Sequence, residues 1–161
     1  MERDRKAEPM ISQKSKYALK ALIVLAEEYG KGPVLIADIA AREHIPRSFL
    51  ELILLELKNH RFLDSRKGRG GGYLLAKPPT QISAGQVLRA IEGPLAPLPC
   101  ASKTAYRRCE ECHDERSCAV RLLMCDVREA TAHILDMTTL TDLLKRSQVA
   151  AHGAQVLDFS I

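Results

Sequence analysis

Four glycines within five residues, Gly68-Arg69-Gly70-Gly71-Gly72, constrain the fold of this chain more than any other feature. They lie between two short stretches typical of β-strands, residues 62–67 and 72–76. Glycine tolerates the positive φ angles that tight hairpin tips need, and Lys67 and Arg69 make this tip basic. We therefore predict a β-hairpin with a basic, glycine-rich tip. A nucleotide-binding loop is excluded, because these glycines lead into a strand and not into a helix N-terminus.

Three helical segments precede the hairpin. Apolar residues recur at helical spacing from Ser15 until Gly30, Gly32 and Pro33 end the first helix, and a second helix covers roughly residues 36–43. The third follows Pro46, and its apolar face consists of Phe49, Leu50, Ile53, Leu54 and Leu57. Three helices followed by a hairpin is the order of a winged helix-turn-helix, whose third helix enters the major groove of DNA. The predicted fold class is mainly α with a small β-hairpin wing.

The residues expected to contact DNA lie on the third helix and at the hairpin tip. Arg47, Ser48 and Glu51 occupy the first turns of the helix, away from its apolar face, where Arg can read guanine and Glu can accept from a cytosine amino group. Lys67 and Arg69 can neutralise phosphates. Two alternatives stay open: Ser48 and Glu51 could form a capping box, and the hairpin charges could simply be solvated.

The charge of the chain is mild, but it is unevenly distributed. The chain contains 24 Lys and Arg residues and 20 Asp and Glu residues. The resulting net charge of +4 does not by itself indicate a nucleic-acid partner. Between residues 58 and 69, however, five basic residues face one acidic residue, Asp64. Such local basicity is expected of a docking surface for DNA.

All five cysteines lie between Cys100 and Cys125. No apolar run could span a bilayer and no secretion signal is visible near the N-terminus, so we expect a cytoplasmic protein whose thiols stay reduced. Four of the cysteines have the spacing C-x8-C-x2-C-x5-C and can hold one metal centre, and these are Cys100, Cys109, Cys112 and Cys118. Zinc, a 2Fe-2S cluster and a 4Fe-4S cluster all suit four cysteines.

Two neighbours of this cluster have simpler explanations. Cys125 falls about two turns into the following helix, where we expect a small buried residue at a dimer seam. His113 is expected to be a solvated loop histidine. No Ser/His/Asp constellation, phosphate loop or dinucleotide fingerprint is present, so a metal-dependent enzyme is the least favoured function.

Several segments together resemble the Rrf2 family of bacterial transcription regulators. The resemblance rests on residues 11–19, 36–40, 45–51, the wing 65–76 and Ile91-Glu92-Gly93, and it covers about residues 10–145. It implies a homodimer that binds palindromic double-stranded DNA and is joined by a long C-terminal helix. Sensing members hold an iron-sulfur cluster through three cysteines of this loop, and their usual fourth ligands are replaced here by Lys16 and Arg121. An extra cysteine could take that place.

The combined prediction divides the chain into five parts. These are a flexible extension (1–9), a winged helix-turn-helix ending in a helix capped by Ser83 (10–92), a cysteine-rich cluster loop (93–117), dimerisation helices (118–146) and a flexible tail (147–161). The long helix begins near Ser117 and a last short helix near Thr138, and the expected dimer interface contains Val120, Leu123, Val127 and Ile134. The expected function is regulation of transcription in response to iron-sulfur status, redox state or nitric oxide. The alternative is the same fold with a zinc or thiol/disulfide switch.

Overall fold

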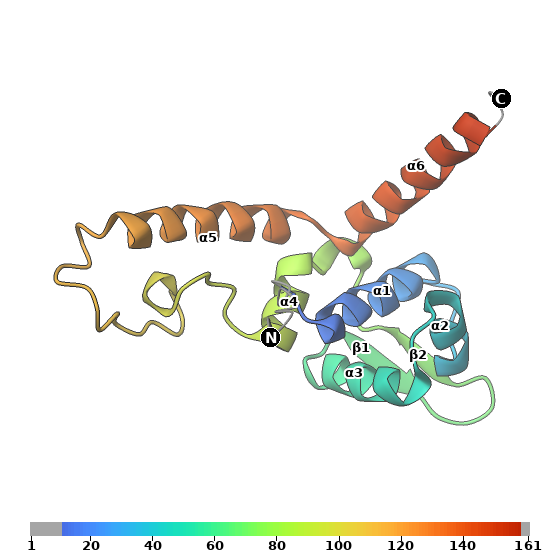
Figure 1. Cartoon of the computed structure of the whole chain (residues 1–161). Helices are drawn as coiled ribbons and strands as arrows, with labels where there is room; N and C mark the ends of the chain where they lie inside the picture. Colours follow the sequence, from blue (N-terminus) through green and yellow to red (C-terminus); the bar gives the residue numbers. More distant parts are fainter. Residues whose placement is uncertain (1–10, 159–161) are drawn as a thin grey trace, which may run out of the picture.

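The structure is a computed structural model that describes residues 11–158. The predicted extension 1–9 and the last three residues of the predicted tail lie outside this range. Eight helices and strands succeed one another along the described chain (Figure 1), and two short 3-10 turns, η1 (Pro79–Gln81) and η2 (Pro99–Ala101), separate some of them. They are α1 (Gln13–Glu27), α2 (Ile36–Glu43), α3 (Arg47–Asn59), β1 (Leu63–Arg66), β2 (Gly72–Leu75), α4 (Ala84–Glu92), α5 (Ala119–Met137) and α6 (Leu140–Asp158).

The first four helices and the hairpin form the winged domain, which encloses one aliphatic core. Tyr17 of α1 and Phe49 of α3 add an edge-to-face aromatic pair with ring centroids 5.7 Å apart. The predicted apolar face of the third helix is confirmed, since its three leucines and Ile53 are fully buried. The core side chains without any exposed surface include Leu22, Ile39, Leu50, Ile53, Leu54, Leu57, Ile82 and Leu88.

A side chain at the helix start explains where α4 begins. Ser83 caps α4 in a complete capping box, because its hydroxyl accepts from the Gln86 N–H and the Gln86 side chain accepts from the Ser83 N–H. By contrast, α3 begins after Pro46 and no described side chain caps its first turn. The capping box considered for Ser48 and Glu51 is therefore wrong, since Ser48 already lies inside the helix.

The hairpin pairs β1 with β2 in antiparallel register, from Leu63 opposite Leu75 to Arg66 opposite Gly72. It continues into the body of the domain, because Tyr73 and Val34 exchange two backbone hydrogen bonds of 2.8 Å each. A Cβ on Gly72 would lie 2.3 Å from the Val34 carbonyl oxygen, and one on Gly71 would lie 2.3 Å from that of Arg66. Close backbone packing within the protein therefore requires these two glycines, and no approach to DNA is needed to explain them.

The C-terminal helices are arranged differently. The 93–118 loop extends away from the winged domain and α5 returns alongside it, and α6 then passes α1 and projects beyond the domain (Figure 1). The prediction of a short last helix is wrong, because α6 continues through Ser147 to Asp158. Gln148, Ala150 and Ala151 are residue types that favour helices. This part of α6 is exposed, as at Val149, so its sequence has no periodic pattern of buried apolar residues from which the helix could be predicted. No helix in the described range is long and apolar enough to cross a membrane.

Candidate nucleic-acid interface and cysteine loop

The side of α3 opposite the core is exposed and polar at its beginning. Arg47, Ser48 and Glu51 are all exposed there, and the Nε atom of Arg47 lies 3.3 Å from a carboxylate oxygen of Glu51. This i,i+4 pair partly satisfies both charges in the absence of another molecule. Since both side chains remain more than half exposed, the pair is weak and can open toward a ligand.

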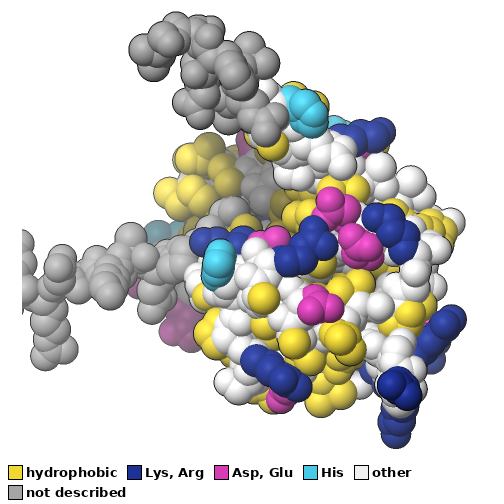
Figure 2. Space-filling view, turned by 90° about the vertical axis from the view of Figure 1, so that its right-hand side faces the viewer, with side chains coloured by type: hydrophobic (Ala, Val, Ile, Leu, Met, Phe, Trp, Pro, Cys, Tyr) yellow, Lys and Arg dark blue, Asp and Glu magenta, His cyan; other side chains and the backbone are white. Residues whose placement is uncertain are grey.

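The hairpin tip provides a second exposed group of cations. Arg66, Lys67 and Arg69 are all exposed. The Nζ atom of Lys58, at the end of α3, donates a 2.6 Å hydrogen bond to the Ser65 hydroxyl on β1, which ties the helix to the hairpin. Figure 2 views the molecule from the side of α2 and the hairpin loop, and Lys and Arg side chains project at the edge of this face. Sequence reasoning counted Lys58 among the basic residues but did not predict this link.

Three of the four candidate ligand cysteines come together. The Cys112 thiol interacts with the thiols of Cys118 and Cys109, and these two neighbours raise the pKa of Cys112 to about 12. The pKa of Cys118 is lowered, chiefly by the backbone N–H of Arg121 at the start of α5 and by the neighbouring Cys112 thiol. Cys118 is the N-cap residue of α5, one position after the predicted start near Ser117.

The fourth cysteine is held separately. Cys100 is buried in the η2 turn, and the Arg121 side chain donates a 3.0 Å hydrogen bond to its carbonyl oxygen. Within residues 11–158, no three His, Cys, Asp or Glu side chains have the arrangement of a formed metal site. Of the two residues given simpler explanations, His113 is exposed, as expected for a solvated loop histidine, and Cys125 is half-buried in the single chain.

Residues that sequence reasoning missed shape the cysteine loop. The Glu115 carboxylate accepts hydrogen bonds from the Tyr106 hydroxyl and from the Cys109 backbone N–H. The Tyr106 bond is the larger cause of the lowered pKa of Glu115. Arg128 of α5 donates to the carbonyl oxygen of Ala101, next to Cys100. Tyr106 and Glu115 are nine positions apart in an irregular loop, so no periodic pattern could have predicted their contact.

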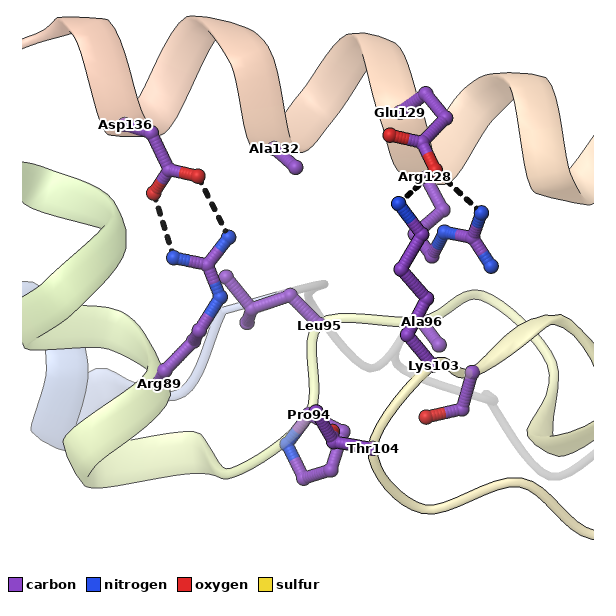
Figure 3. Close-up of a pocket in the computed structure, with 11 residues that line it drawn as sticks. Arg89, Pro94, Leu95, Ala96, Lys103, Thr104, Arg128, Glu129, Ala132 and Asp136 are labelled. Carbon is purple, nitrogen blue, oxygen red and sulfur yellow. Dashed lines mark hydrogen bonds and ion pairs between the residues drawn. The ribbon is translucent and has the colours of Figure 1, made fainter.

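A cavity of about 250 Å³ separates the 94–104 segment from α5 (Figure 3). At one end, Arg89 of α4 forms a two-pronged ion pair with Asp136 of α5, with N···O distances of 2.5 and 3.0 Å. The guanidinium group lowers the pKa of the Asp136 carboxyl. At the other end, Lys103 and Arg128 both contact Glu129, and Lys103 is the larger cause of the lowered Glu129 pKa.

Backbone hydrogen bonds strengthen the connection between α4 and the α5–α6 corner. The Ala84 N–H donates to the Thr138 carbonyl oxygen over 2.8 Å, and the Leu140 N–H donates to that of Ile82 over 2.9 Å. Together with the Arg89–Asp136 pair, these bonds make the junction between the winged domain and α5. These contacts hold the C-terminal end of α5 against the winged domain, which also contains α3.

Comparisons with known proteins assign the chain to a family. The profile of the Rrf2 family, described as an iron-dependent transcriptional regulator, matches residues 11–146. An rrf2-like HTH-type transcriptional regulator of Rhodobacter capsulatus is 43% identical over 88% of this chain and 97% of its own. The regulator CymR of Bacillus subtilis is 35% identical over 83% of this chain and 88% of its own.

Solved structures agree with this assignment. The structure of CymR, the global cysteine regulator of B. subtilis, superposes with a TM-score of 0.72 at 33% identity, covering 84% of this chain and 96% of CymR. That of T. potens IscR gives a TM-score of 0.68 at 27% identity, covering 87% of this chain and 89% of IscR. These relatives are regulators and not enzymes, and the predicted winged helical fold is confirmed. The chain belongs to the Rrf2 family of DNA-binding transcriptional regulators.

Proposed function

We propose that this chain is a homodimeric regulator that senses iron-sulfur status, redox state or nitric oxide through a cysteine-ligated iron-sulfur cluster. The observation that carries the proposal is that the Cys112 thiol neighbours those of Cys109 and Cys118, the last of which is the N-cap residue of α5. That helix also bears the exposed apolar residues expected at a dimer interface. One structural feature thus connects a thiolate site with the helix that would join two DNA-binding domains.

The chemistry of these three cysteines fits an iron-sulfur cluster. Their thiols already approach one another, and the backbone N–H groups at the start of α5 favour the thiolate form of Cys118 that metal binding requires. Cys100, on the adjacent η2 turn, would supply the fourth ligand. A bound cluster supplies a centre that exchanges electrons and reacts with oxygen or nitric oxide. IscR of Sodalis glossinidius, 31% identical over 86% of this chain and 81% of its own, supports an interpretation based on iron.

The apolar stripe of α5 supports the homodimer. The stripe contains four apolar residues separated by three, four and seven positions, and all are exposed in the single chain. They are Val120, Leu123, Val127 and Ile134. A second copy of α5 would remove these side chains from water. Two winged domains related by the resulting two-fold axis would bind a palindromic operator, with Arg47, Ser48 and Glu51 toward base edges and Lys67 and Arg69 toward phosphates.

The hydrogen bonds of the loop suggest how the two sites are coupled. Arg121 and Arg128 hold the backbone around Cys100 against α5, while the junction at Arg89 and Asp136 holds α5 against the winged domain. A change at the cysteines that repositions the loop would therefore shift the angle or spacing of the two DNA-binding domains. A coupling of about 1–3 kcal/mol between the thiol site and operator affinity is the usual range for such linkage.

The decisive experiment is the absorption spectrum of anaerobically purified protein, together with iron and zinc analysis. We expect thiolate-to-iron absorption that is lost in Cys100→Ala and in Cys118→Ala, because a cluster left with three protein ligands exposes an open iron. The matched control Cys125→Ala should keep the colour. Colourless protein with one zinc per chain would instead establish the zinc alternative. A full cluster in Cys100→Ala would show that the fourth ligand is another residue.

The assignment of the DNA contacts is tested by salt titration of binding. Lys67→Ala or Arg69→Ala should weaken binding to all duplexes and reduce the salt slope by about one unit per lost phosphate contact. Arg47→Ala should reduce discrimination between operator and scrambled DNA by about 1–3 kcal/mol if the contact to guanine is bidentate. Equal losses on both duplexes for Arg47→Ala, or an unchanged salt slope for the wing variants, would contradict these assignments.

A further inference from the structure

Two leucines lie on the solvent-facing side of α3. Leu52 and Leu55 are 63% and 53% exposed, whereas Leu54 between them is fully buried. At 100° per residue, both share the outward arc of the helix with Ser48 and Glu51. Other large apolar side chains are exposed singly in the described part of the chain outside α5, and these are Tyr29, Leu35, Tyr106 and Val149. The two leucines are thus a pair on one helix face, and the fold of the single chain gives no reason for their exposure.

The charges around the pair indicate what covers it. Arg47 precedes Leu52 on α3, Lys58 follows Leu55 by less than one turn, and the hairpin tip adds Lys67 and Arg69. Glu51 pairs with Arg47 and Glu56 pairs with Lys14, so Lys58, Lys67 and Arg69 leave this side of the domain with an excess of positive charge, which suits a polyanion. The major groove of DNA presents one apolar group at the base edges, the C5-methyl group of thymine. Leucine can neither donate nor accept a hydrogen bond, so of the groups at the base edges only this methyl suits it.

We propose that Leu52, with Leu55 beside it, contacts thymine methyl groups and makes this protein select A·T pairs at those positions of its operator. This inference rests on the proposed function, in which α3 enters the major groove. Leu52 lies one helical turn after Ser48, close to the N-terminal part of α3 that approaches base edges, and Leu55 lies one turn farther. Leu52 therefore makes the closer contact.

Replacement of thymine by uracil tests the contact directly, because it removes the methyl group and leaves every hydrogen-bonding group in place. The full-length protein is first used to select duplexes from a random library. Each thymine of the selected duplex is then replaced by uracil, and affinity is measured by fluorescence anisotropy. We expect one position per half-site where uracil weakens binding of the unmodified protein about fourfold, which corresponds to one methyl group removed from water.

The same positions should be insensitive to uracil in Leu52→Ala and in Leu52→Gln, which keeps the length of the side chain. Because residue 52 is exposed, neither substitution should disturb folding, and circular dichroism verifies this. Val149, another well-exposed aliphatic residue on α6, supplies the matched control Val149→Ala, which should retain the full uracil effect.

Two kinds of result would overturn the proposal. The unmodified protein could tolerate uracil at every position, or Leu52→Ala could keep the full uracil effect. Either result, with Arg47→Ala still impairing discrimination, would reject the leucine contact and leave α3 as the reading helix. If no duplex is selected and Arg47→Ala binds all sequences as the unmodified protein does, the proposed role of α3 itself fails, and the leucine contact fails with it.

Discussion

The winged domain and α5 differ sharply in how much of their surface one chain can bury. In the winged domain, α3 alone buries Leu50, Ile53, Leu54 and Leu57 completely. All 19 residues of α5 lie in the described part of the chain, yet none is buried, and Val120, Leu123, Val127 and Ile134 all face water. Two helices with equally regular apolar spacing thus have opposite environments.

This contrast shows that apolar periodicity identifies a face to be buried but not the molecule that buries it. For α3 the covering elements are α1, α2 and the hairpin of the same chain. For α5 the cysteine loop covers one side, through hydrogen bonds from Arg121 and Arg128, and a second chain is expected to cover the apolar stripe. Substitutions in the two regions can test this difference, and the largest effect is expected in the stripe itself.

Introducing a charge into the α5 stripe should abolish the dimer. Val127→Asp would place an unpaired carboxylate in an apolar seam, at a cost of several kcal/mol. Sedimentation velocity should show monomers, and operator binding should be lost with them. Val149→Asp on α6 is the control for the added charge and should remain dimeric. A monomeric unmodified protein at micromolar concentration would contradict the prediction.

Truncation of two nearby leucines on α3 should have very different consequences for folding. Leu54→Ala should lower the free energy of unfolding by about 2–5 kcal/mol, because it leaves a cavity in a closed core. Leu52→Ala should change it by less than about 0.5 kcal/mol, since its side chain is already exposed. Urea denaturation measures both. Similar losses for the two variants would show that the outer face of α3 is covered in the free protein.

The junction between the two regions should depend modestly on pH. Arg89 lowers the pKa of Asp136, so this ion pair stabilises the folded state above the ordinary carboxyl pKa of 3.8 and its contribution disappears as the pH falls below that value. Both side chains are substantially exposed, so Asp136→Asn should cost at most about 1 kcal/mol at pH 7. The difference from the unmodified protein should shrink as the pH falls below 3.8.

Gly85 offers a matched test of the same contact. A Cβ there would lie 2.0 Å from a carboxylate oxygen of Asp136, so Gly85→Ala should displace that carboxylate. Gly85→Ala and Asp136→Asn should therefore not be additive in a double-mutant cycle at pH 7. Additive losses would mean that the alanine acts on α4 packing and leaves the ion pair intact.

The smallest effect is expected within the cysteine loop. Tyr106→Phe removes one of the two donors that hold Glu115 and should speed amide exchange across residues 103–116 several-fold. The unfolding midpoint should not change, because this exposed bond adds little to global stability. Exchange in α4 serves as the internal control. Unchanged exchange in the loop would show that Tyr106 does not order it.

Local signals predicted much of the winged domain. The spacing of apolar residues located the buried faces of α1 and α3, and Ser83 marked the start of α4. These predictions succeeded because caps, glycines and periodic burial act over a few residues. The end of α6 was missed for the same reason, since an exposed helix beyond Ser147 has no burial period to reveal it.

The candidate site shows where local signals are insufficient. Cysteine spacing indicated a shared thiol site but could not show that Cys109, Cys112 and Cys118 meet while Cys100 is buried separately. Glu115 contacts other residues of the irregular loop, whereas Arg121 and Arg128 reach from α5 to the backbone around Cys100. Their geometry depends on the path of the whole loop, which no short-range pattern specifies.

The sequence by itself determined the order of elements, the basic glycine-rich hairpin, the clustered thiols and the Rrf2 family resemblance, because each depends on residue type and spacing along the chain. Only the tertiary structure decided which glycines are required by close backbone packing, how Arg89 and Asp136 join α4 to α5, and that Leu52 and Leu55 face outward beside buried Leu54. The physical reason is that burial and pairing are properties of surfaces brought together from distant parts of the chain.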